Sequence, residues 1–187
     1  MGSRAAGKTR ATIHGTFTLG LLLFLMASAN AQASDGIELA GTILMYALPV
    51  TAYGMTASHD DGEGALQYSE AAALTLGVTF TLKNTIDAER PDGGSQSFPS
   101  GHTSVSFSAA EFVRKRYGPE YGMPLYAAAA FVGYSRVEAD RHYVRDVVAG
   151  AVIGIASSYL FTSPYYGWSI LAEAADGYYG LVAVRPW

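Results

Sequence analysis

Long apolar runs separated by short polar connections constrain the fold of this chain more than any other feature. Residues 39–58 carry no charge, residues 71–82 are equally free of charge, and a further apolar run begins at Val147. No period-two alternation typical of a half-buried strand occurs before about residue 164. Apolar runs of this length favour helices that pack on one another. The sequence therefore predicts an all-α fold, a helical bundle over residues 34–164. The expected helices cover residues 39–58, 65–83, 103–113, 124–134 and 147–161.

The first 33 residues have the anatomy of a secretory signal peptide. Basic residues precede an apolar run over residues 17–27, and Ala31-Gln32-Ala33 follows as a cleavage site of the A-x-A kind. The run is shorter than the ~20 residues that a membrane-spanning helix needs. We therefore expect residues 1–33 to be removed during export, with a retained membrane anchor as the alternative.

The balance of acidic and basic residues limits the classes of molecule that the protein can bind. Three of the twelve basic residues lie in the expected signal peptide, whereas all sixteen acidic residues follow it. The remaining chain is therefore acidic, which argues against a nucleic-acid partner. There is no cysteine, so neither disulfides nor thiolate metal sites contribute. His59-Asp60-Asp61 is interpreted as part of a solvated turn rather than as a metal site.

Three polar patches, which combine basic residues, histidines and a carboxylate, interrupt the apolar runs. They are Lys83 with Arg90-Pro91, then Pro99-Ser100-Gly101-His102, then Ser135-Arg136 with His142 and Asp146. Ser100 can cap a helix whose free N–H groups and dipole favour an anion. On a helix, the spacing of His142 and Asp146 places both on one face, as in a nucleophile or base that a carboxylate orients. A simple polar helix start, with Asp146 in its first turn, is the alternative interpretation.

Together the three patches resemble the signature of a known superfamily. The pattern K-x6-R-P, P-S-G-H and S-R-x5-H-x3-D is similar to that of the type 2 phosphatidic acid phosphatases and vanadium haloperoxidases, over about residues 65–163. The resemblance implies a helical bundle of that kind and a bacterial lipid-phosphate phosphatase-like member. The loop between Arg90-Pro91 and Pro99 is shorter than in most of the family. The resemblance therefore does not predict for this chain any substrate specificity that the loop provides in other family members.

The resemblance also implies a role for each matched residue. His142 would be the nucleophile that forms a phosphohistidine, Asp146 would orient it, and His102 would be the general acid. The phosphate group would be bound by Lys83, Arg90, Ser100, Gly101 and Arg136. This scheme needs neither a metal nor another cofactor. Arg141 and Arg145 are interpreted as solvated residues or as residues that support the phosphate-binding groups from behind.

The leading hypothesis is an exported, metal-independent phosphatase that acts on a phosphate monoester or pyrophosphate, with a phosphorylated membrane lipid as its substrate. The alternatives are a soluble broad-specificity acid phosphatase, a vanadate-dependent haloperoxidase and a non-catalytic envelope scaffold. Charged residues make up 15% of the chain, a large share for a protein that crosses a membrane many times. We therefore expect a periplasmic or cell-envelope domain at the membrane surface, with an integral membrane protein as the alternative.

The last residues, 165–187, differ in character from the rest. Residues 168–173 and 179–184 are rich in residues that favour strands, and Ala175-Asp176-Gly177 separates them. Such a pattern predicts a small β-hairpin in a C-terminal tail.

Overall fold

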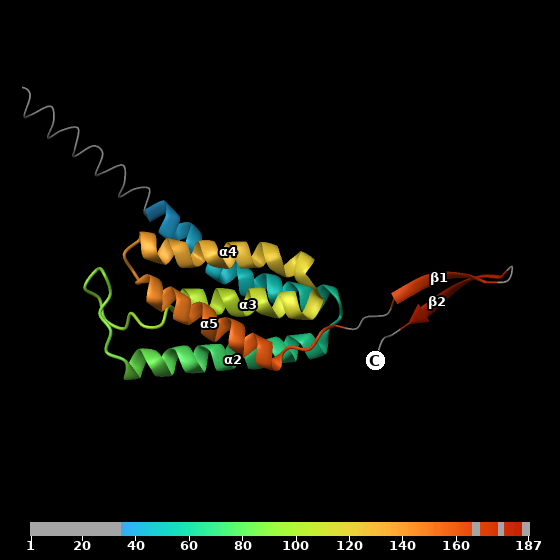
Figure 1. Cartoon of the computed structure of the whole chain (residues 1–187), viewed down its shortest axis with the longest axis horizontal. Coiled ribbons are helices and arrows are strands. Elements are labelled where there is room, and N and C mark those ends of the chain that lie inside the picture. The colour runs from blue at the N-terminus through green and yellow to red at the C-terminus, as the bar shows by residue number, and fades with distance from the viewer. Residues whose placement is uncertain (1–34, 166–168, 176–177, 185–187) are drawn as a thin grey trace, which may run out of the picture.

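The helices of the described chain lie side by side in a bundle (Figure 1). The computed structural model describes residues 35–165, 169–175 and 178–184, so the expected signal peptide lies outside the described residues. The helices are Asp35–Ser58, α2 (Gly62–Thr85), α3 (Gly101–Tyr117), α4 (Pro119–Glu138) and α5 (Val144–Phe161). The prediction of an all-α bundle is confirmed.

Helix α4 begins five residues earlier than the expected start at Pro124. Gly118 adopts a φ of 116°, a conformation that favours glycine, and this lets the chain reverse directly after α3. Pro119 then occupies the first turn, where its fixed φ suits a helix and its missing N–H costs nothing. The expected loop between these two helices is therefore reduced to a single residue.

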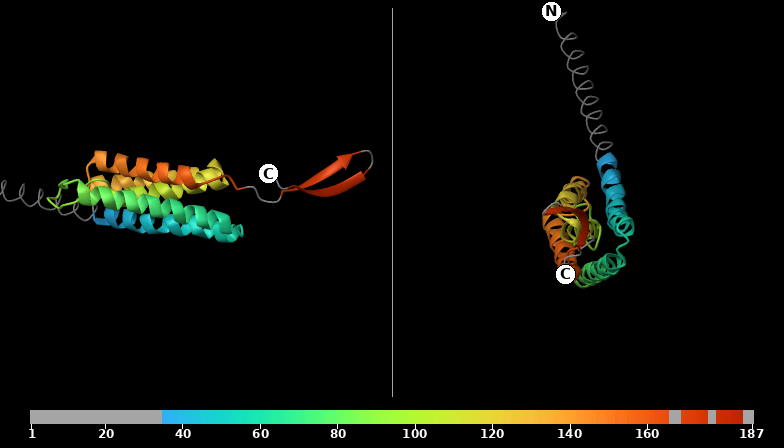
Figure 2. Two further views of the ribbon diagram at one scale, coloured as in Figure 1. Left: turned by 90° about the horizontal axis from the view of Figure 1, so that it is seen from below. Right: turned by 90° about the vertical axis from the view of Figure 1, so that its right-hand side faces the viewer.

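Helix α3 lies at the centre and packs against α2, α4 and α5 (Figures 1 and 2). Glycines let α5 approach it closely: a Cβ atom at Gly154 would lie 2.2 Å from the carbonyl oxygen of Ser104. Hydroxyl groups also link the helices, for example Thr79 Oγ1 to Ser104 Oγ at 3.0 Å. Small residues and interhelical hydroxyl bonds are typical of helices that pack in a membrane.

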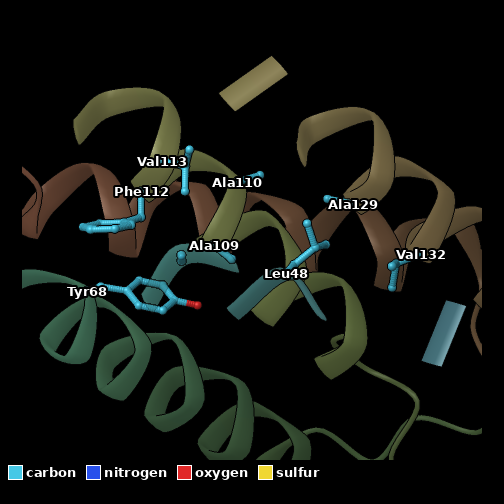
Figure 3. Packing of buried hydrophobic residues seen from close by; sticks show 9 residues of the cluster. Leu48, Tyr68, Ala109, Ala110, Phe112, Val113, Ala129 and Val132 are labelled. Atoms are coloured by element: carbon cyan, nitrogen blue, oxygen red, sulfur yellow. The ribbon is translucent and has the colours of Figure 1, made fainter. Parts of the chain in front are cut away.

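The apolar core lies between the helix Asp35–Ser58, α2, α3 and α4. Its largest members are Tyr68 and Phe112, whose ring centroids are 4.8 Å apart (Figure 3). Alanines and small aliphatic residues fill the rest of the cluster, so the helix axes can approach closely.

A buried ion pair ties the helices together at the end of the bundle where α3 terminates. Asp61 accepts hydrogen bonds from two nitrogens of Arg116, at 2.8 and 2.6 Å, and it also caps α2 through the N–H of Gly64. Arg116 in turn donates to the carbonyl of Ser163, which follows α5. The interpretation of Asp61 as part of a solvated turn was therefore wrong, because its carboxylate is almost fully buried.

The C-terminal tail forms the expected hairpin. Strand β1 (Ser169–Ala175) pairs antiparallel with β2 (Tyr178–Val184), and Ser169 lies opposite Val184. In Figure 1 the hairpin projects from the helical bundle.

Chain direction alternates between successive helices along the bundle (Figure 1). The C-terminal ends of α2 and α4 therefore meet the N-terminal ends of α3 and α5 at one end, the left in Figure 1. All three polar patches occur at these helix ends or in the loops between them. The fold thus gathers the three polar patches, which are spread from Lys83 to Asp146 in the sequence, at a single end of the bundle.

Candidate active site

The three polar patches surround a cavity of about 470 Å³. Six of the eight expected site residues line it, namely Lys83, Arg90, Gly101, His102, Arg136 and His142. Ser100 and Asp146 are not on the cavity wall and are fully buried behind it. Together with Arg141, the wall presents four cationic side chains and two imidazoles. Such a lining suits a multiply charged anion.

The cations of the first patch are held by the loop that leads to the second. Lys83 Nζ donates to the carbonyl of Gln96 at 2.7 Å, and Arg90 Nε donates to the carbonyl of Ser95 at 3.0 Å. Burial and the nearby charge of Arg90 lower the pKa of Lys83. The loop over residues 90–99 therefore fixes both cations, although it is short.

Helix α3 begins at the second patch. Ser100 Oγ is its N-terminal cap and accepts a hydrogen bond from Thr103 Oγ1 at 2.9 Å. The N–H of Ser100 donates to the carbonyl of Asp146 at 2.9 Å, which joins the second patch to the third. The first turn of α3, with Gly101 and His102 on the cavity wall, therefore directs its dipole to the site. The expected contact of Ser100 with phosphate stays a prediction.

The third patch is a tight loop after α4. The backbone N–H groups of Arg141 and His142 both donate to the carbonyl of Arg136, at 3.0 and 3.2 Å. The Arg136 guanidinium is almost fully buried, and its Nε donates to Ser135 Oγ at 3.2 Å. This loop therefore places Arg136 and His142 on the same cavity.

Asp146 caps helix α5 and also lies next to His142. Its Oδ2 accepts hydrogen bonds from Ser97 Oγ at 2.5 Å and from the N–H of Tyr143 at 3.0 Å, so it caps the start of α5. The same oxygen lies 3.8 Å from His142 Nδ1, which is an ion-pair distance but longer than a hydrogen bond. Asp146 is thus a helix cap that lies beside the histidine.

Both histidines of the cavity favour the neutral form. Burial lowers the pKa of His142 to about 4, and the charges of Lys83 and Arg90 act in the same direction. Burial and the charge of Arg136 likewise lower the pKa of His102 to about 4. In the ligand-free protein both rings are therefore uncharged near pH 7, and each keeps a lone pair.

Sequence reasoning missed several residues at this site. Arg141 is exposed, as expected of a solvated residue, but it also lines the cavity and pairs with Glu38 Oε1 and Asp92 Oδ2, both at 3.0 Å. Glu38 also lines the cavity, and Ser97 supports Asp146. Glu38 could have been noticed in the sequence, because it is an acidic residue directly before the uncharged run over residues 39–58. Nothing comparable marks Ser97.

Comparison with known proteins agrees with this geometry. The family model of the PAP2 superfamily matches residues 93–169, which include the second and third patches. Lipid A 4'-phosphatase of Helicobacter pylori is 30% identical over 179 residues, which are 87% of this chain and 90% of that protein. Lipid A 1-phosphatase of Porphyromonas gingivalis is 37% identical over 98 residues, 49% of this chain but 22% of that protein.

A solved structure supports the fold independently. The crystal structure of LpxE from Aquifex aeolicus superposes with a TM-score of 0.57 and 23% sequence identity. The match covers 66% of this chain and 83% of that one. The helical bundle is therefore shared with that protein.

Proposed function

Because the chain belongs to the PAP2 superfamily, we propose that it hydrolyses a phosphate monoester or pyrophosphate group of a membrane lipid. The family makes it a phosphoric monoester hydrolase. The observation that carries the proposal is the cavity in which four cations and two neutral imidazoles meet. Two relatives are lipid A phosphatases, so a phosphorylated lipid of that class is the first substrate to test.

Apolar side chains that line the cavity beside the cations support a lipid substrate. Met45, Leu76 and Val105 form an apolar part of the cavity wall. Leu76 and Val105 also line a second pocket of about 140 Å³, between the helix Asp35–Ser58, α2 and α3, whose accessible surface is almost entirely apolar. A hydrocarbon chain could lie in this second pocket while its phosphate occupies the cavity. A water-soluble phosphate ester gains nothing from such a surface.

His142 is the proposed nucleophile. Its lowered pKa keeps the ring neutral, so a lone pair is available for attack. A bond forms between a ring nitrogen and phosphorus while the bond from phosphorus to the lipid oxygen breaks. Lys83, Arg90 and Arg136 stabilise the negative charge on the equatorial oxygens as it is transferred. Water then attacks the phosphohistidine and releases inorganic phosphate.

His102 is the proposed general acid. Bound phosphate enables it to donate a proton by raising the pKa of its ring. In the ligand-free protein its pKa is about 4, because burial and Arg136 disfavour the charged ring. A phosphate dianion in the cavity offsets the cations and raises the pKa of His102 toward the range that a proton donor needs. The proton goes to the leaving oxygen, and the neutral ring then accepts one from the attacking water.

We further propose that the bundle lies in the bilayer rather than on its surface. Two described helices, Asp35–Ser58 and α5, are long and apolar enough to cross a membrane. Residues spaced along each helix are more than half exposed, among them Leu39, Ile43, Val50, Val144, Val148 and Val152. Apolar surfaces of this extent on a water-soluble protein would favour aggregation. Export of the chain stays a prediction that rests on residues 1–33.

Phosphate release by the purified full chain in detergent tests the function. The assay compares an aryl phosphate with lipid A and other lipid phosphates, in EDTA, for the wild type and His142→Ala. We expect metal-independent release that prefers a lipid and is lost in the variant. His59→Ala, at the opposite end of the bundle, is the control and should match the wild type.

Other outcomes would favour the alternatives. Preference for the aryl phosphate would support a broad-specificity phosphatase. Halide oxidation that requires added vanadate would support a haloperoxidase. Equal release by His142→Ala, or none by any protein, would overturn the phosphohistidine mechanism.

A further inference from the structure

We propose that one turn of the helix Asp35–Ser58, formed by Glu38 and Gly41, positions Arg136 for phosphate binding. Neither residue belongs to the three polar patches, and both precede residues 93–169, which the family model matches. The inference rests on the proposed function but adds residues that the sequence pattern does not contain. It makes the first described helix a component of the active site.

The first observation is the direct contact of the helix backbone with Ser135-Arg136. A Cβ atom at Gly41 would lie 1.9 Å from Ser135 Oγ and 3.1 Å from a terminal nitrogen of Arg136. Two other glycines of the helix, Gly36 and Gly54, have no neighbouring atom within 4 Å of such a Cβ. Gly41 is therefore the position at which this helix approaches α4 most closely among its three glycines.

The second observation is the set of acceptors around the Arg136 guanidinium. One turn before Gly41, the backbone carbonyl of Glu38 accepts a hydrogen bond from Arg136 Nη2 at 2.5 Å. The carboxylate of Glu38 lies 3.5 Å from Nη1, and Ser135 Oγ accepts from Nε. A guanidinium has five N–H donors, so this arrangement fixes its plane and leaves donors for an anion in the cavity.

The third observation is a bridge that holds the same turn to the loop after Arg90. Arg141 pairs through Nε with Glu38 and through Nη1 with Asp92, which lies in the loop after Arg90. The turn at Glu38 is therefore linked on one side to Arg136 and on the other to the first polar patch. A displacement of this turn would move Arg136 relative to the other cations.

Displacing Arg136 should slow the reaction, because catalysis depends strongly on the geometry of the groups that bind phosphate. A misplacement of about 1 Å in a group that binds the reacting phosphate can cost ~100-fold in rate. Alanine at position 41 must separate the helix from Ser135-Arg136 by a comparable amount, because its Cβ overlaps Ser135 Oγ. Gly41→Ala should therefore reduce kcat/KM ~10- to 100-fold and raise the Ki of inorganic phosphate.

The experiment compares Gly41→Ala with Gly54→Ala, the same substitution on the same helix at an open position. Both are purified as full chains in detergent, and kcat, KM, the Ki of inorganic phosphate and Tm are measured. Gly54→Ala should stay within about twofold of the wild type in all kinetic constants, because its Cβ meets no atom. A folded Gly41→Ala protein with wild-type constants would overturn the inference.

A double-mutant cycle separates positioning from general damage. If Gly41 acts through Arg136, adding Gly41→Ala to Arg136→Ala should change kcat/KM less than about twofold. An effect as large in the Arg136→Ala background as in the wild type would contradict the proposal.

A rescue covers the case in which Gly41→Ala does not fold. Ser135→Gly removes the side chain that the new Cβ meets, so Gly41→Ala/Ser135→Gly should retain at least half the activity of Ser135→Gly alone. A much lower value would show that contact with Ser135 is not the cause. A wild type without phosphatase activity would instead overturn the proposed function.

Discussion

Ser97 illustrates how a residue outside every motif supports the site. It is fully buried, and its hydroxyl donates to the carboxylate of Asp146 at 2.5 Å. Ser97→Ala removes this donor and leaves a buried carboxylate oxygen with the N–H of Tyr143 alone. We expect the free energy of unfolding to fall by about 1–3 kcal/mol. We expect kcat to fall ~10-fold, because Asp146 lies beside His142.

Denaturant unfolding and steady-state kinetics of Ser97→Ala would check both changes. Ser95→Ala is a matched control in the same loop, because Ser95 is exposed and contributes its carbonyl rather than its hydroxyl. A Ser97→Ala protein with wild-type stability and kcat would show that the bond to Asp146 is dispensable.

The buried histidines predict a loss of stability in mild acid. In the unfolded chain a histidine binds a proton near pH 6.5, whereas burial lowers the pKa of His142 to about 4. Between these values the unfolded state binds more protons, so stability is lost as the pH falls from 6.5 toward 4. The shift corresponds to at most about 3 kcal/mol for His142.

Melting curves between pH 7.5 and 4.5 measure this effect. Tm should fall with pH in the wild type and fall less steeply in His142→Asn, which cannot take up the proton. Identical slopes in the two proteins would mean that His142 is not protonated on unfolding.

Individual residues also differ in how far the sequence could reveal them. Lys83, Arg90, His102, Arg136 and His142 were predicted to lie together, and they line one cavity. They were found because their spacing forms a pattern within short stretches. Glu38 contributes through a backbone carbonyl as well as its side chain, and every residue has a carbonyl. The role of the carbonyl therefore has no sequence signature, although the acidic side chain of Glu38 had one.

At the scale of elements, the contact between α3 and α5 depends on Gly150 and Gly154. A Cβ atom at Gly154 would lie 2.2 Å from the carbonyl oxygen of Ser104 and 2.7 Å from the backbone nitrogen of Ser108. Backbone atoms cannot rotate away as side chains do, so the helices must separate. We expect Gly154→Ala to destabilise the protein by about 1–3 kcal/mol.

Thermal unfolding of Gly154→Ala beside Gly77→Ala tests this contact. Gly77 lies in α2, where a Cβ atom would have no neighbouring atom within 4 Å, so alanine there should stabilise the helix by up to about 1 kcal/mol. Equal Tm values for the two variants would contradict the close packing.

The order of the helices was predictable from the sequence, and so were the ends at Ser58 and Phe161, whereas the start of α4 was not. Apolar runs located most helices of the described chain, and the helix start at Pro99-Ser100 located α3. The start of α4 depends on the backbone conformation of Gly118, and the burial of Asp61 depends on Arg116, 55 residues later. Contacts between distant segments decide both, so local composition could not.

At the scale of the whole molecule, exposed apolar residues predict how the protein is held in the cell. If the bundle lies in the bilayer, it should stay in the membrane pellet after washing with alkaline carbonate, because the lipid covers Leu39, Val50 and Val152. Immunoblots of pellet and supernatant give the readout. Release by carbonate or by high salt would support a protein bound at the surface instead.

The gathering of the site at one end of the bundle has a consequence for sidedness. In a bilayer, a bundle with its cations at one end can take substrate from one leaflet only. In sealed vesicles with uniformly oriented enzyme, hydrolysis would stop when that leaflet is exhausted, with half of the lipid untouched. The further supply of substrate would then depend on lipid translocation between leaflets. The orientation of insertion, rather than the chemistry of the cavity, would decide which pool of lipid is dephosphorylated.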